Sequence, residues 1–256
     1  MASKCLFPLA VVFAFVGYFV FLWFRDRSVQ DRSLFTMETK LVVVTNRYKE
    51  NIQWLYEKVD APIVVCQKTD TVTGATCDTE NLGREASSYL KFILQNYDRL
   101  PRYVAFLHGH ETAWHQRENI VQRLNRFAAE SCPKGYITLN NNWIWNTEGN
   151  STVDLARTDK LGYSDVWGYL FQEELGPAPT EDAYFDHDCC AQFIVSREAI
   201  LRHDKKSYQK WYDFLMQEPK NTWRTILFEH VWHMIFGEPM QRDREEYYKD
   251  FETCFT

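Results

Sequence analysis

The chain has 256 residues, of which 45% are hydrophobic and 25% are charged, a composition typical of a globular protein rather than of a disordered one. Its formal net charge of −6 argues against a nucleic-acid-binding protein, which normally carries a basic surface. Only 10 residues are glycine, and neither a G-x-G-x-x-G nor a G-x-x-x-x-G-K-S/T motif occurs. We therefore expect neither a Walker NTPase, nor a protein kinase, nor a standard dinucleotide-binding enzyme.

An apolar segment without any charge covers residues 6–24, LFPLAVVFAFVGYFVFLWF. About 20 apolar residues cross the ~30 Å of hydrocarbon in a bilayer, so this segment is long enough to span a membrane. A cleaved signal peptide is the alternative, but its apolar part runs for only about 7–15 residues and ends at small side chains. The segment here ends in bulky residues, and we predict a cytoplasmic tail (1–5), an uncleaved signal anchor (6–24) and a polar stem (25–40).

The orientation of the predicted anchor in the membrane must be inferred from the charges, cysteines and glycosylation sequon around it. Lys4 precedes the segment and three arginines follow it, so the positive-inside count does not set the orientation. Six of the seven cysteines follow the segment, an even number that suits disulfides, and Cys66 and Cys77 bracket a polar loop that they could close. Free buried thiols in a cytosolic protein are the alternative. With a glycosylation sequon at Asn150, these features favour a single-pass type II membrane protein of the Golgi or ER with a luminal C-terminal domain.

Beyond the stem, strand and helix patterns alternate. Two helical segments are predicted, over 51–59 and 81–96. Because strands that alternate with helices form parallel sheets with right-handed crossovers, we expect a single α/β domain over 41–240. Its sheet would be mostly parallel and flanked by helices. Three short apolar runs predict strands buried on both faces: Leu41–Val44, Ile63–Cys66 and Tyr103–Leu107.

The second half of the chain has a weaker pattern. We predict a helix over 117–131, mostly loop over 140–183, a strand over 192–195, helices near 197–217 and 222–236, and a C-terminal tail over 241–256.

The densest group of chemically active residues follows the third predicted strand. Open α/β sheets bind ligands beyond the carboxyl ends of their strands, which is where His108, His110, Glu111 and His115 stand. Imidazole suits zinc, nickel or copper, whereas manganese and magnesium prefer oxygen ligands. These histidines could bind a metal or a substrate, or simply hydrogen-bond their own loop.

Two further patterns carry carboxylates. Glu229 lies on a predicted helix and shares one face with Trp232 and His233, so it could act as a general base, although the same helix is also expected to pack in the core. Asp186 and Asp188 form the Asp-x-Asp pair of the chain, a spacing that chelates Mn²⁺ or Mg²⁺ and also arises by chance.

The start of the second predicted helix is a candidate anion site. Asn81 is a suitable N-cap, and the helix N-terminus together with Arg84 could bind an anion. Simple capping with a surface ion pair between Arg84 and Glu85 is the alternative.

Five segments together resemble an uncharacterised family, described only as a domain of unknown function, that is similar to glycosyltransferases. The match extends over about Leu41–Phe236, and the wider similarity is to nucleotide-sugar transferases of the GT-A type. The segments are VVVTNRYKENIQWL, NLGREASSYLKFILQNYDRLP, YVAFLHGHETAWH, CCAQFIVSREAI and FEHVWHMIFGE.

The resemblance implies roles on the donor side of the site. Asn46, Arg47 and Glu50 stand where such enzymes hold the nucleotide base, and His108 and His110 stand where they usually carry the metal-binding Asp-x-Asp. Arg84 and Glu85 join this donor-binding group in our prediction.

On the acceptor side, the resemblance places Gln192 on the strand that faces the acceptor and makes Glu229 the late carboxylate that acts as base. Trp114 offers a flat ring on which an acceptor sugar could stack. Asp188 is the alternative base.

We therefore expect a membrane-anchored glycosyltransferase that moves a sugar from a nucleotide-sugar donor to a glycan or glycoprotein. Its cofactor would be Mn²⁺ or Mg²⁺, held by Asp186 and Asp188, or Zn²⁺ if His108 and His110 are ligands. The alternatives are a metal-dependent carbohydrate-modifying hydrolase that uses the histidine cluster and a non-catalytic carbohydrate-binding protein. No nucleic-acid partner is expected.

Overall fold

The computed structural model describes residues 34–70, 77–113, 116, 118–140, 143–144, 163–178, 187–188, 191–218, 223–240, 245 and 251–255. Several predictions fall outside these residues: the anchor (6–24), Trp114, His115, Asn150 and Asp186. Within the described residues, no helix combines the length and the apolar character needed to cross a bilayer. The residues from Phe35 onward belong to one compact unit, and the description below concerns that unit.

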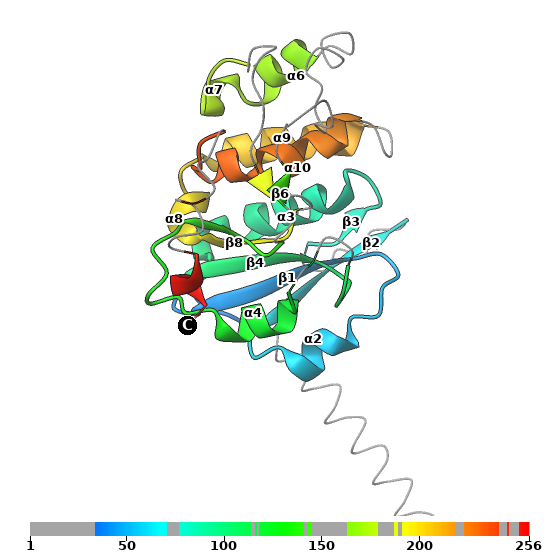
Figure 1. Cartoon of the computed structure of the whole chain (residues 1–256). Coiled ribbons are helices and arrows are strands. Elements are labelled where there is room, and N and C mark those ends of the chain that lie inside the picture. The colour runs from blue at the N-terminus through cyan, green and yellow to red at the C-terminus, as the bar shows by residue number, and fades with distance from the viewer. Residues whose placement is uncertain are drawn as a thin grey trace, which may run out of the picture. The chain divides into compact units, whose positions relative to one another are not determined.

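A mixed six-stranded sheet lies at the centre of this unit, with the strand order β3-β2-β1-β4-β8-β5 (Figure 1). The pairs β3–β2, β2–β1 and β1–β4 are parallel, whereas β8 is antiparallel to both β4 and β5. The strands are β1 (Leu41–Arg47), β2 (Ile63–Thr69), β3 (Thr79–Glu80), β4 (Tyr103–His108), β5 (Tyr136–Thr138) and β8 (Phe193–Ser196).

The three predicted parallel strands are confirmed, but the expectation of a mostly parallel sheet is corrected to a mixed one. The chain enters β8 at the edge of the sheet where β4 ends, since Phe193 pairs with Phe106 and Ser196 with Tyr103. A strand that starts at this edge must run against its neighbours. The direction of β8 depends on the path of the preceding chain, which the apolar pattern of 192–195 does not encode.

The helices differ from the predictions mainly at their ends. The expected helix 117–131 is confined to α4, the expected helix 81–96 begins only at Arg84, and the expected loop 140–183 contains α6 and α7. The helices are α2 (Gln53–Lys58), α3 (Arg84–Asn96), α4 (Ile120–Arg126), α6 (Tyr163–Leu170), α7 (Gln172–Leu175), α8 (Arg197–Ile200), α9 (Lys205–Gln217) and α10 (Trp223–Ile235), with 3-10 turns η1 (Tyr97–Arg99) and η2 (Glu252–Cys254). A separate two-stranded pair joins β6 (Trp143–Ile144) to β7 (His187–Asp188).

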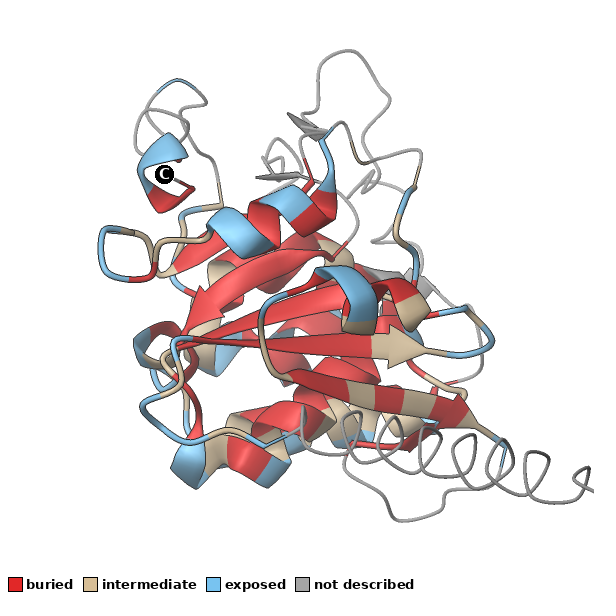
Figure 2. Ribbon diagram, turned by 90° about the horizontal axis from the view of Figure 1, so that it is seen from below, coloured by how far each residue is buried: buried red, intermediate tan, exposed pale blue. Residues whose placement is uncertain are grey.

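The side chains of alternate strand residues point to opposite faces of the sheet and pack into two hydrophobic cores, one on each face. Val42 and Val44 pack with α3, α9 and α10, whereas Leu41 and Val43 pack with α2, α4 and the C-terminal segment. Figure 2 shows that the strands are buried for most of their length, whereas the helices on both sides have exposed outer faces. This burial explains why the strands read as continuous apolar runs.

Two disulfides stabilise the unit. Cys66–Cys77 closes the polar loop as predicted, and Cys132–Cys254 joins residues that are 122 positions apart. Constraining the unfolded chain over a loop of about 100 residues stabilises a fold by roughly 4–5 kcal/mol in the chain-entropy model. Residues 251–255, which we expected to lie in a C-terminal tail, therefore pack on the core, where Phe251 and Phe255 are buried.

The ring of Phe193 should be a strong determinant of stability, because it is fully buried with five aromatic rings within 6.0 Å between centroids: Tyr89, Phe106, Tyr136, Trp232 and Phe236. We predict that Phe193→Ala lowers the free energy of unfolding of the full-length protein by about 3–5 kcal/mol in denaturant titrations. Tyr169→Ala, at a side chain that is 62% exposed, is the control and should cost less than about 0.5 kcal/mol. Equal losses in the two variants would contradict this packing.

Candidate functional site

The carboxyl ends of β1, β2 and β4 meet at one edge of the sheet. In the strand register Asn46 lies opposite Cys66 on one side and opposite His108 on the other. This is the edge at which parallel α/β sheets place their ligands. The backbone positions at the ends of the first three predicted strands therefore lie side by side at this edge.

Helix α3 starts at this edge through an unusual turn. Gly83 and Arg84 have positive φ angles of 64° and 49°, and no side chain caps the helix. The predicted N-cap at Asn81 is therefore wrong, because the left-handed turn starts the helix three residues later. The turn needs glycine for two reasons: its φ angle, and a Cβ on Gly83 that would lie 2.9 Å from the Cβ of Leu215.

The first two turns of α3 connect the edge of the sheet to α10. Ser88 donates a hydrogen bond from its Oγ to Asn46 Oδ1 at 2.8 Å. Arg84 Nη1 lies 3.2 Å from Glu229 Oε1 in an ion pair that joins residues 145 positions apart. The side chains of α3 thus bring residues of β1 and α10 into one site.

Lys68 is a member of this site that sequence reasoning missed. Its side chain is buried, and its ammonium group donates hydrogen bonds to Leu82 O at 2.7 Å, to Glu80 O at 3.3 Å and to Ser87 Oγ. Burial lowers the pKa of Lys68 to about 7, although the nearby carboxylate of Glu85 raises it. A lysine at the end of a strand that begins with four apolar residues (IVVCQKT) was the sequence feature that could have indicated this role.

The carboxyl group of Glu229 has a raised pKa. Burial and, to a smaller extent, the negative charge of Glu85 raise its pKa, the Arg84 guanidinium lowers it, and the resulting pKa is about 7. Its side chain is 20% exposed and that of Arg84 is 37% exposed, so the pair borders solvent. The alternative of a surface pair between Arg84 and Glu85 is not observed, since neighbouring helix residues point in different directions.

Tyr89 forms the buried wall next to these carboxylates. Burial raises its pKa well above 10, and the charges of Glu85 and Glu229 raise it further. Its hydroxyl donates a hydrogen bond to Ala191 O at 3.1 Å. The three side chains therefore form one electrostatic group at the start of α3.

A second group lies where the loop after β1 contacts the loop after β4. Glu50 Oε2 accepts hydrogen bonds from the backbone N–H groups of Tyr48 at 2.6 Å and Lys49 at 3.0 Å, and Glu50 Oε1 lies 3.9 Å from His110 Nε2. Burial raises the pKa of Glu50, but its own backbone N–H, those of Tyr48 and Lys49, and His110 outweigh that effect and lower the pKa overall. The predicted donor-side residues Glu50 and His110 are thus neighbours.

Arg47 and Gly109 hold this loop contact in place. Arg47 Nε donates to Glu50 O at 3.0 Å, and its Nη1 donates to Gln67 Oε1 at 3.4 Å. A Cβ on Gly109 would lie 2.9 Å from the Cβ of Glu50. Arg47 therefore stabilises the loop, and Gly109 allows its close approach.

Gln192 is buried instead of lining an open acceptor site. Its Oε1 accepts a hydrogen bond from the backbone N–H of His108 at 3.1 Å, and its Nε2 donates to Asn140 Oδ1 at 3.0 Å. Gln192 thus positions the end of β4. Asp188 pairs through its backbone with Trp143, and its side chain lies outside what the structure describes.

The described residues contain no group of three or more His, Cys, Asp or Glu side chains that could hold a metal ion. His110 faces Glu50, and the edge offers no third ligand to this pair among the described side chains.

The fold and this edge define the class of the protein: a single α/β domain with a mixed sheet and a cluster of charged residues at the carboxyl ends of its parallel strands. Residues 42–256 match the family described as protein of unknown function (DUF3431), and the chain belongs to this family. Comparisons with curated proteins and with solved structures gave no match.

The raised pKa of Glu229 makes stability depend on pH. The folded protein keeps a proton on this carboxyl up to about pH 7, whereas an ordinary carboxyl loses it near 4.5, so the stability contributed by the neutral form is complete below pH 4.5 and is lost as the pH rises through 7. Glu229→Gln should therefore raise the free energy of unfolding at pH 8 by on the order of 2 kcal/mol and change it little at pH 4. Denaturant titrations at both pH values would measure this difference.

Glu173→Gln, at an exposed glutamate of α7, is the matched control and should be neutral at both pH values. A Glu229→Gln effect that does not depend on pH would contradict the proposed environment of this carboxyl.

Proposed function

We propose that this protein is a glycosyltransferase-like enzyme that transfers a sugar from a nucleotide-sugar donor to a glycan or glycoprotein acceptor. One observation supports the proposal: Glu229, with a pKa of about 7, is paired with Arg84 at the edge where α/β sheets generally bind their ligands. A carboxylate whose pKa lies near the working pH is suited to general base catalysis.

In the proposed reaction the oxygen of an acceptor hydroxyl attacks the anomeric carbon of the donor sugar. The bond between that carbon and the diphosphate oxygen breaks, and the nucleoside diphosphate leaves with the bonding electron pair. Glu229 accepts the proton of the acceptor hydroxyl. Asp188 is the alternative base.

Arg84 supplies positive charge for the leaving diphosphate. One of its guanidinium nitrogens contacts Glu229, and the other donors make no hydrogen bond within the described residues. They can therefore donate to phosphate oxygens. Lys68 acts indirectly, because it holds the β3–α3 turn that carries Arg84.

The donor nucleotide would contact the neighbouring loops. Asn46, Glu50 and His110 lie at the same edge, with Arg47 holding their loop. His108 and Glu85 complete the proposed donor side. On the acceptor side we place Trp114 and Gln192, and Gln192 acts indirectly because its hydrogen bond positions the end of β4. A divalent ion, Mn²⁺ or Mg²⁺ with oxygen ligands or Zn²⁺ with His108 and His110, would add positive charge there.

The cellular location of the protein is the second part of the proposal. We infer a type II protein whose anchor (6–24) lies in the Golgi or ER membrane and whose domain is luminal, with a glycan on Asn150. The two disulfides support this placement, because such bonds persist in oxidising compartments and are rare in the cytosol.

The first test measures donor hydrolysis and transfer by the full-length protein with a panel of nucleotide sugars, with and without Mn²⁺. Glu229→Gln should lower kcat at least 100-fold with little change in donor affinity, because it removes the base but not the donor contacts. Glu173→Gln is the control and should keep the wild-type rate. If folded protein neither binds nor hydrolyses any donor, the proposal is wrong.

A second test separates the role of Arg84. Arg84→Ala should raise the KM for the donor and lower kcat about 100-fold or more, since the guanidinium contacts the diphosphate in both the bound and the transition state. Arg202→Ala, at an exposed arginine of the turn after α8, serves as the control. An unchanged donor KM in Arg84→Ala would remove Arg84 from the donor site.

A further inference from the structure

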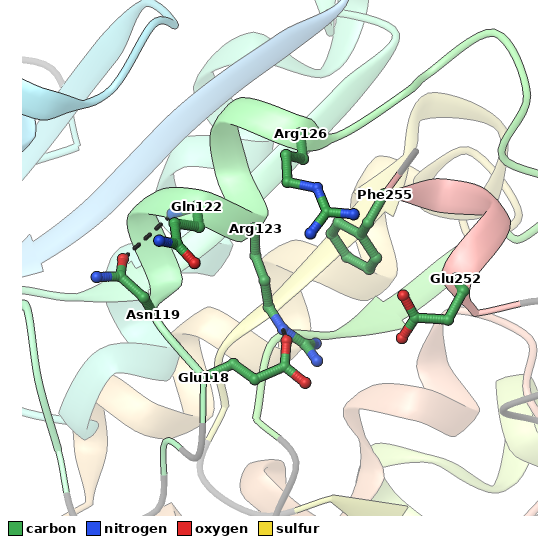
Figure 3. Close-up of a pocket in the computed structure, with 7 residues that line it drawn as sticks. All are labelled: Glu118, Asn119, Gln122, Arg123, Arg126, Glu252 and Phe255. Carbon is green, nitrogen blue, oxygen red and sulfur yellow. Dashed lines mark hydrogen bonds and ion pairs between the residues drawn. The ribbon is translucent and has the colours of Figure 1, made fainter.

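A second candidate binding site lies on the other face of the sheet from Glu229. A cavity of about 310 Å³ opens between α4 and the C-terminal segment that contains η2 (Figure 3). Its volume is at the lower end of the range of small-molecule sites, about 300–1,000 Å³. The elements that form it pack on the core of α2 and α4, whereas Glu229 belongs to the α3–α10 side.

The walls of this cavity are held rigidly. Arg123 is only 4% exposed, and its guanidinium lies 4.8 Å from the centre of the Phe251 ring and 5.3 Å from that of Phe255. Arg123 Nε also contacts Glu118 Oε2 at 2.7 Å. The disulfide of Cys254 fixes the C-terminal segment in place, so the cavity is preformed.

The groups that line the cavity have unused hydrogen-bonding capacity. Gln122 and Arg126 project from α4, and Glu252 projects from the C-terminal segment (Figure 3). None of these three side chains makes a hydrogen bond or ion pair in the part of the chain that the structure describes. Each ends in a flat group that can contact two neighbouring ligand atoms, with Gln122 and Arg126 as donors and Gln122 and Glu252 as acceptors.

The charged side chains that line the cavity indicate whether an anion, a cation or a neutral molecule fits it best. Arg123 and Arg126 are balanced by Glu118 and Glu252, so the formal charges cancel. An anion or a cation would therefore meet repulsion as well as attraction. A neutral molecule with adjacent hydroxyls, which both donate and accept hydrogen bonds, matches a lining of mixed donors and acceptors.

We propose that this cavity binds a neutral oligosaccharide. The binding does not depend on catalysis at Glu229, and it would hold a glycan chain on a second surface of the domain.

The test applies the full-length protein to an array of neutral and of sialylated oligosaccharides and measures the best neutral binder by isothermal titration calorimetry. Gln122→Ala and Arg126→Ala should each weaken binding at least tenfold, and both should unfold like the wild type because their side chains are exposed and unbonded. Gln172→Ala and Arg202→Ala, which truncate exposed residues elsewhere, are the matched controls and should bind normally.

Binding should persist in 1 M NaCl, where the Debye length is about 3 Å and binding through surface charges is screened. Glu229→Gln should also leave it unchanged; loss of binding in that variant would place the glycan at the other edge and overturn the proposal. Absence of any neutral binder, preference for sialylated glycans, loss of binding in salt, or normal binding by Gln122→Ala and Arg126→Ala would each overturn it too.

Discussion

Gly83 enters α3 in a left-handed conformation against the side chain of Leu215, where a Cβ would approach to 2.9 Å. This close approach sets where α3 begins and which of its side chains reach the edge of the sheet. If the helix began at Asn81, as its sequence suggested, the positions of Arg84, Ser87 and Ser88 around the helix axis would differ. The contacts with β1, β2 and α10 depend on this turn.

Lys68 stabilises the same turn through hydrogen bonds to its backbone. Its buried ammonium group donates to two backbone carbonyls of the β3–α3 connection and to Ser87. A buried cation is expensive unless its hydrogen bonds are made, and three acceptors match the three donors of an ammonium group. The negative charge of Glu85 stabilises the charged form of Lys68 and raises the pKa of Glu229, so these groups respond to each other.

The two faces of the sheet therefore have different chemistry. On the α3–α10 face, burial and unequal neighbouring charges change the acidity of a partly buried carboxylate, which suits proton transfer. On the α4 face, balanced charges surround free amide and guanidinium groups, which suits recognition of a neutral molecule. Both faces rest on strands that are buried for most of their length, so one sheet supports both sites.

The sequence alone was sufficient to predict β1, β2 and β4 and their parallel order, because strands buried on both faces must be apolar along their whole length. It also indicated that Cys66 and Cys77 could pair, and it selected Glu229 and Arg84 separately. It did not indicate that these two residues form an ion pair across 145 positions, nor that Lys68 belongs to the site. Only the tertiary structure decided these points, together with the antiparallel direction of β8 and the packing of residues 251–255, because each depends on contacts between distant segments that no local pattern records.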